Sequence, residues 1–133
     1  MKFLLDTNVC IDYLTQRYPR VVERIQAARP EDLATSAIVA AELRFGADKS
    51  RQPARNHARL DVFLGELRSM DFDLDAAAAY GGLRADLERR GRPIGAHDML
   101  IAAQALSAGL TLVSDNVREL GRVPGLTVEN WRR

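Results

Sequence analysis

Short apolar stretches alternate along this chain with longer stretches whose apolar residues recur at helical spacing. The short stretches at 2–5, 32–36, 110–114 and 126–130 have the length and composition of buried strands. The longer ones predict helices at 9–16, 19–28, 37–47, 58–69, 76–90 and 97–108. Strands separated by helices pair in parallel and are covered on both faces. The sequence therefore predicts an α/β fold with a small, mostly parallel sheet.

The chain is expected to form one domain over 1–133, with the charged, proline-containing segment 46–57 as its loosest connection. Cys10 is the single cysteine, which excludes an internal disulfide and makes a thiolate metal site a poor match. We expect Cys10 to pack as a small apolar residue. No stretch resembles a signal peptide or a membrane span, so a cytoplasmic protein without a membrane partner is expected.

Four acidic positions stand out because charged neighbours do not surround them. Asp6 ends the first predicted strand, and Asp115 follows the third predicted strand with Asn116 beside it. Glu42 is the one charge in "LATSAIVAAEL", and Asp98 precedes the apolar run "MLIAA". Each position has a simple structural explanation, as a helix cap, a turn residue or a first-turn acid that interacts with the helix dipole.

Taken together, these positions favour a functional site. Asp6 and the Asp115–Asn116 pair are predicted at the carboxyl ends of parallel strands, where open α/β sheets form their ligand sites. Glu42 and Asp98 lie on helices that could approach the same edge. Carboxylates drawn into one pocket repel one another, and a hard divalent cation such as Mg²⁺ or Mn²⁺ relieves that repulsion. Such a site is suited to phosphodiester hydrolysis, because the ion polarises the phosphate and activates water.

The stretches "LLDTNV", "LATSAIVAAELRFGA", "GRPIGAHDMLIAAQAL" and "LTLVSDNVREL" follow one another over nearly the whole chain. "DTN" has little specificity by itself. The complete set, in this order, resembles the PIN-domain ribonucleases of the VapC toxin type. The resemblance implies an α/β/α sandwich and an endoribonuclease that depends on Mg²⁺ or Mn²⁺.

The resemblance also assigns expected roles to single residues. Asp6 and Asp98 match the acids that bind the metal, and Glu42 matches the second acid of the family's motif. Thr7 and Asn8 match polar residues that support the site through hydrogen bonds, and Ser36 matches a small hydroxyl residue ahead of the glutamate.

The fourth acidic position departs from the family's pattern. The family's acid falls two residues after the Ser or Thr that ends the late strand, and this chain has Asn116 there. Asp115 comes one residue early, so strand alternation would point its side chain elsewhere. Glu119 is a further candidate. An asparagine can still coordinate through its carbonyl oxygen or orient a water, with less negative charge.

The net charge of +1 gives no sign of a nucleic-acid partner, so RNA would be met by a local cluster of cations. Arg92, just ahead of the Asp98 helix, is the first candidate for a phosphate contact, and Arg44 is another. The further candidates are Lys49, Arg51, Arg55, Arg59, Arg89 and Arg90. His97 is adjacent to Asp98, but we expect it to be an exposed first-turn residue outside the site, since its side chain points about 100° away.

The resemblance implies three partners, which are an RNA such as tRNA or rRNA, a second copy of the chain in a homodimer, and a cognate VapB-type antitoxin. The tail of the antitoxin would block the acidic pocket, with an arginine competing with the metal. Because Asn116 stands where the family has an acid, an alternative is a PIN-like module with weak catalysis that binds RNA or has a regulatory role. A receiver-like or dehalogenase-like phosphate-accepting domain fits less well, because Asn8 occupies the position where such a domain wants a second aspartate.

Overall fold

The computed structural model describes residues 1–133, and one parallel sheet of five strands lies at its centre, in the order β3-β2-β1-β4-β5. The strands are β1 (Phe3–Leu5), β2 (Leu33–Ser36), β3 (Arg68–Met70), β4 (Thr111–Val113) and β5 (Val128–Glu129). All four strand pairs are parallel. The predicted α/β fold with a small parallel sheet is confirmed.

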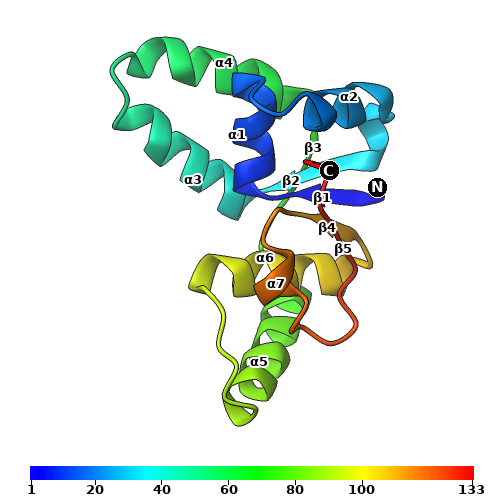
Figure 1. Cartoon of the computed structure of the whole chain (residues 1–133). Coiled ribbons are helices and arrows are strands. Elements are labelled where there is room, and N and C mark those ends of the chain that lie inside the picture. The colour runs from blue at the N-terminus through cyan, green and yellow to red at the C-terminus, as the bar shows by residue number, and fades with distance from the viewer.

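Helices cover both faces of the sheet, which makes three layers (Figure 1). One face carries α1 (Thr7–Thr15), α2 (Pro19–Ala27), α3 (Ala37–Asp48) and α4 (Pro53–Gly65). The other carries α5 (Leu74–Arg89), α6 (Ala96–Ala108) and the short α7 (Val117–Leu120). A single 3₁₀ turn, η1 (Pro30–Asp32), precedes β2. None of the helices combines the length and apolar composition that a bilayer span requires.

The central strand β1 is buried because both of its faces are covered. Leu4 and Leu5 of β1 are fully buried, as are Leu112 and Val113 of the neighbouring β4. Parallel strands enclosed by helices need apolar residues on both faces, which explains the continuous run "FLL". Cys10 lies in the same core, and burial raises the pKa of its thiol, so the side chain packs as an apolar residue, as expected.

The predicted helices and the four predicted strands form within a few residues of their expected limits, but three details were wrong. Residues 58–69 do not form one helix, because α4 ends at Gly65 and β3 follows at the sheet edge. β3 has the sequence "RSM" and is largely exposed, so it lacks the apolar run by which a strand is recognised. The segment 46–57 is not loose, since α4 begins at Pro53, a residue favoured at a helix start.

The end of the chain is anchored in the core. Trp131 is 2% exposed, and its ring meets the ring of Phe3 edge to face at 5.0 Å. The Arg24 guanidinium lies 4.8 Å from the centre of the Trp131 ring and also pairs with Glu129. The indole nitrogen donates to Glu129 Oε1 at 2.9 Å. These contacts fix the residues after β5 against β1 and α2.

We expect Trp131→Ala to lower the free energy of unfolding by about 3–5 kcal/mol, because it leaves a large cavity beside β1. Urea unfolding followed by circular dichroism measures the loss. Val62→Ala is the matched control, since Val62 is 65% exposed, and should change stability by less than about 0.5 kcal/mol. Equal stability of wild type and Trp131→Ala would contradict the anchoring of the chain end.

Candidate active site

The carboxyl ends of β1 and β4 meet at one edge of the sheet. The two strands pair in parallel with Leu5 opposite Val113, so the next residues, Asp6 and Ser114, lie side by side. The Asp6 amide donates to the Val113 carbonyl at 3.1 Å, which continues the strand pairing by one more hydrogen bond. This register therefore brings together the two loops that carry most of the predicted site residues.

Asp6 is both a helix cap and a buried carboxylate. Its Oδ1 accepts a hydrogen bond from the Val9 amide at 3.0 Å, which caps α1. The residue is 7% exposed. Burial raises its pKa from 3.8 to about 6, while hydrogen bonds from Ser114 and Val9 oppose the rise and nearby Asp115 and Asp98 add to it. The capping role and the functional role are thus combined in one side chain.

Asp98 projects from the first turn of α6 and receives an amide. Asn116 Nδ2 donates to Asp98 Oδ2 at 2.8 Å and to Glu119 Oε2 at 3.1 Å. Burial is the main cause of a raised pKa at Asp98, with Glu119 and Asp115 contributing. The Asn116 amide stands between two acids that would otherwise repel each other, and its own backbone nitrogen is held by Ser114 Oγ at 3.0 Å.

Glu42 reaches the site from α3 and is paired there. The N-cap of α3 is Ser36, a fully buried residue whose Oγ accepts from the Val39 amide at 3.2 Å. Glu42 Oε1 lies 2.8 Å from His97 Nε2. The expectation that His97 stays outside the site is wrong, because its exposed ring contacts Glu42 on α3 and lines the same cavity.

A cavity of about 100 Å³ unites most of the predicted residues. Asp6, Asp98 and Glu42 line it, together with the supporting Thr7 and Asn8. The remaining lining residues are Ile38, Val39, His97 and Ile101. Ser36 acts at a distance, as the cap that sets the start of α3. A larger, mainly apolar cavity of about 280 Å³ lies between α1, α3 and α4, and it shares Glu42 with the acidic one.

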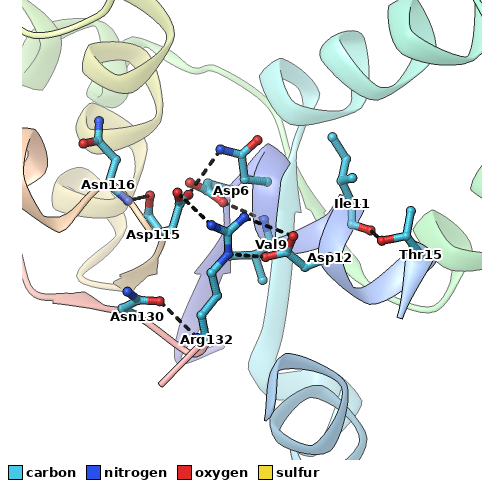
Figure 2. Close-up of polar contacts among 11 residues, drawn as sticks. Asp6, Val9, Ile11, Asp12, Thr15, Asp115, Asn116, Asn130 and Arg132 are labelled. Atoms are coloured by element: carbon cyan, nitrogen blue, oxygen red, sulfur yellow. Dashed lines mark hydrogen bonds and ion pairs between the residues drawn. The ribbon is translucent and has the colours of Figure 1, made fainter. Parts of the chain in front are cut away.

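Asp115 lies beside this cavity rather than in its lining. Its Oδ1 accepts from Asn8 Nδ2 at 3.2 Å, and its Oδ2 lies 3.3 Å from Arg132 Nη1 (Figure 2). The expectation that the Asp115 side chain points elsewhere is confirmed, since it does not line the cavity, although its charge lies close enough to raise the pKa values of Asp6 and Asp98.

Two residues of this neighbourhood were missed from the sequence. Asp12 on α1 is 3% exposed and pairs with Arg132 at 2.7 Å. Asp12 could have been found, since it is the only charge in "VCIDYL", the same signal that marked Glu42. Arg132 gave no signal, because only the fold brings the chain end against α1.

The donor set of the site suits a hard cation bound by few protein ligands. No three His, Cys, Asp or Glu side chains converge closely enough to hold a metal ion by themselves. Asp6 is buried and Asp98 is half-buried, and they receive their hydrogen bonds from neutral donors, namely Ser114, the Val9 amide and Asn116. Mg²⁺ commonly binds through one or two carboxylates and keeps several waters. The residues present fit that pattern, with Asp6 and Asp98 as the carboxylates.

Comparison with known proteins gives a match to the PIN domain over residues 3–126. The chain belongs to the PIN domain family, and it is of the VapC type. It is 40% identical over 131 residues to the tRNA(fMet)-specific endonuclease VapC of Salmonella typhimurium and 38% identical over 132 residues to Ribonuclease VapC2 of Rickettsia felis, covering 98% of every chain. The crystal structure of DNA-bound VapBC from Salmonella typhimurium superposes with a TM-score of 0.93 at 40% identity, with 98% of each chain covered.

The candidate RNA-binding cations of this PIN domain differ in whether their side chains already bind a protein group. Arg44 is engaged at the α3–α4 contact, where it bonds Asp61 at 2.6 Å and the His57 carbonyl at 3.2 Å. A phosphate contact at Arg44 stays a prediction, and it would have to replace the ion pair with Asp61. Arg92 is exposed in the loop before α6, without a side-chain hydrogen bond or salt bridge. Most of the others also have partners, such as Asp86 for Arg89 and Arg90, and the Leu14 carbonyl for Arg59.

The raised pKa of Asp6 predicts a pH-dependent stability for the metal-free PIN domain. Because the folded state holds the Asp6 proton to higher pH than the unfolded state does, stability falls as the pH rises from 3.8 to about 6 and then levels off. The Asp6 contribution to this loss is about 3 kcal/mol. Asp6→Asn keeps the cap acceptor and removes the titration. Urea unfolding of both proteins between pH 4 and 7 should show their stabilities diverging by roughly this amount, and parallel curves would contradict the assignment.

Proposed function

We propose that this PIN domain is an endoribonuclease toxin that depends on Mg²⁺ or Mn²⁺ and is neutralised by a VapB-type antitoxin. The observation that carries the proposal is that one cavity is lined by two carboxylates with raised pKa values, the buried Asp6 and the half-buried Asp98, without a cationic side chain bonded to either. Holding two ionised carboxylates in one cavity costs free energy unless a bound cation neutralises their charge. The names of the VapC relatives support RNA as the substrate.

Asp6 and Asp98 would hold the ion, which when bound polarises a phosphodiester oxygen and eases the deprotonation of an attacking water. Asn116 orients Asp98 through its 2.8 Å hydrogen bond and separates it from Glu119. Glu42 faces the same cavity and can accept a proton or a water hydrogen bond from the side opposite β4. His97 fixes the Glu42 carboxylate by its 2.8 Å contact, so Glu42 enters the reaction in one orientation.

RNA would enter this cavity from the solvent, and the loop that carries Arg92 leads into α6, the helix of Asp98. Arg92 is exposed and free of partners, so it can contact a phosphate without first breaking an ion pair. Single-stranded loops are the usual targets of sequence-specific RNA recognition, because their bases and backbone are accessible. A tRNA is the first substrate to test, since a relative at 40% identity is named a tRNA(fMet)-specific endonuclease.

A second candidate function is RNA binding without efficient cleavage. Asn116 favours it, because an amide stands where the family places a fourth acid, and the site therefore has less negative charge to hold a cation. One assay separates the two candidates, since binding without product formation in the presence of metal supports only the second.

Incubation with tRNA and rRNA in 5 mM Mg²⁺ or Mn²⁺ is expected to yield cleavage products that EDTA abolishes. Asp6→Asn and Asp98→Asn should each lower the rate at least about 100-fold, because each removes a charge that neutralises the ion. Asp75→Asn is the matched control, since Asp75 is exposed in the first turn of α5, and it should keep full activity. Cleavage that persists with EDTA, or in Asp6→Asn, would rule out the metal mechanism.

The antitoxin partner is supported by the VapBC complex from Salmonella typhimurium, which this PIN domain resembles along its whole length. A homodimer is also part of the proposal. We expect an equimolar cognate antitoxin to abolish RNA cleavage, with an arginine of its tail neutralising Asp6 and Asp98 in place of the metal. Gel-based cleavage assays with increasing antitoxin measure this. Full activity in a stoichiometric, tightly bound complex would contradict it.

A further inference from the structure

Arg132, the penultimate residue, places its guanidinium between two acids from different parts of the fold (Figure 2). Its Nε and Nη2 bond the two oxygens of Asp12 at 2.7 and 3.1 Å, and its Nη1 lies 3.3 Å from Asp115 Oδ2. The Tyr18 ring centre lies 4.2 Å from the guanidinium carbon. All three nitrogens of the planar group therefore donate to a carboxylate.

The backbone that carries Arg132 is itself fixed. Trp131 is buried against Phe3 and Arg24, and the Arg132 amide donates to Asn130 Oδ1 at 3.0 Å. The Asp12 side chain that receives the fork is 4% exposed. Two-point bonding to a buried carboxylate, from a fixed backbone, sets the orientation of the guanidinium and directs Nη1 to Asp115.

Both oxygens of Asp115 are thereby occupied outside the acidic cavity. Oδ2 faces Arg132, and Oδ1 accepts from Asn8 Nδ2 at 3.2 Å. Asn8 lines the cavity, whereas Asp115 does not. Because the Asn8 nitrogen is turned to Asp115, its carbonyl oxygen is the end left without a protein partner. A line of contacts thus runs from buried Asp12 through Arg132 and Asp115 to Asn8.

We propose that Arg132 is a positioning residue that holds Asp115 at the side of the site, out of the metal-binding cavity, and through Asp115 sets the orientation of the Asn8 amide. Without Arg132, Asp115 carries an unneutralised charge next to Asp6 and Asp98 and is free to turn toward them. The chain end thereby limits the number of acids that face the cation. The inference rests on the proposed metal-binding function for its first test only.

Mn²⁺ binding measured by isothermal titration calorimetry at pH 7.5 provides that test. Arg132→Gln is expected to tighten Mn²⁺ binding by roughly threefold to tenfold, because one more uncompensated acid faces the cation. Arg24→Gln is the matched control, since Arg24 also holds the chain end, through Glu129 and Trp131, but has no contact with Asp115. It should leave the affinity unchanged. A purely structural role of Arg132 would weaken binding.

Asp115→Asn tests whether Arg132 acts through Asp115. In an Asp115→Asn background, Arg132→Gln should lose most of its effect on Mn²⁺ affinity, as a coupled pair does in a double-mutant cycle. Arg132→Gln leaves Asp12 buried and unpaired, which could prevent folding. In that case the double variant Asp12→Asn/Arg132→Gln, which lacks the buried charge, is measured instead of the single variant. Affinity that is unchanged or weaker in the folded Arg132 variants overturns the proposal.

A second readout needs no metal. The side-chain amide signals of Asn8 in ¹H–¹⁵N spectra of the metal-free protein should shift in Arg132→Gln and in Asp115→Asn, but not in Arg24→Gln. Unchanged Asn8 signals in Arg132→Gln overturn the link from Arg132 to Asn8. If the wild type binds no Mn²⁺, the proposed metal dependence fails, while the spectra still decide whether Arg132 positions Asn8.

Discussion

The parallel pairing of β1 with β4 is the interaction on which the rest of the site depends. Its register sets Leu5 against Val113, and so places the Asp6 carboxylate beside the Ser114–Asn116 loop at the centre of the sheet. The core behind it, with Leu4, Leu5, Leu112 and Val113 fully buried, excludes water from the Asp6 side. The same packing that stabilises the fold is therefore what desolvates the acid and raises its pKa.

Around that acid, the neutral hydrogen-bond donors contact one set of carboxylates and the basic side chains contact another. A hydroxyl, a backbone amide and an asparagine amide contact Asp6 and Asp98, while His97 and Arg132 contact the acids around them, Glu42 and Asp115. Neutral donors orient a carboxylate without cancelling its charge, whereas an arginine would cancel it. Asp6 and Asp98 therefore keep the charge that attracts a cation, whereas the side chains of Glu42 and Asp115 are held by their basic partners.

Several features could be predicted from the residues alone, and others could not. Asp6, Glu42 and Asp98 were recognisable because a charge in an apolar stretch needs an explanation, and the structure brings all three to one cavity. β3 was missed because an exposed edge strand has no apolar pattern. His97 was misjudged, since spacing along α6 relates it to Asp98 but gives no information on α3, from which Glu42 approaches.

The sequence by itself determined the alternation of strands and helices, the helix cap at Asp6, and the family to which the chain belongs. These depend on local periodicity and on short motifs, which neighbouring residues along the chain decide. Only the tertiary structure decided that Asp115 lies at the side of the cavity and that Arg132 reaches both Asp12 and Asp115. Those contacts join residues 120 and 17 positions apart, and such pairs form only once the sheet has brought the chain end against β1 and α1.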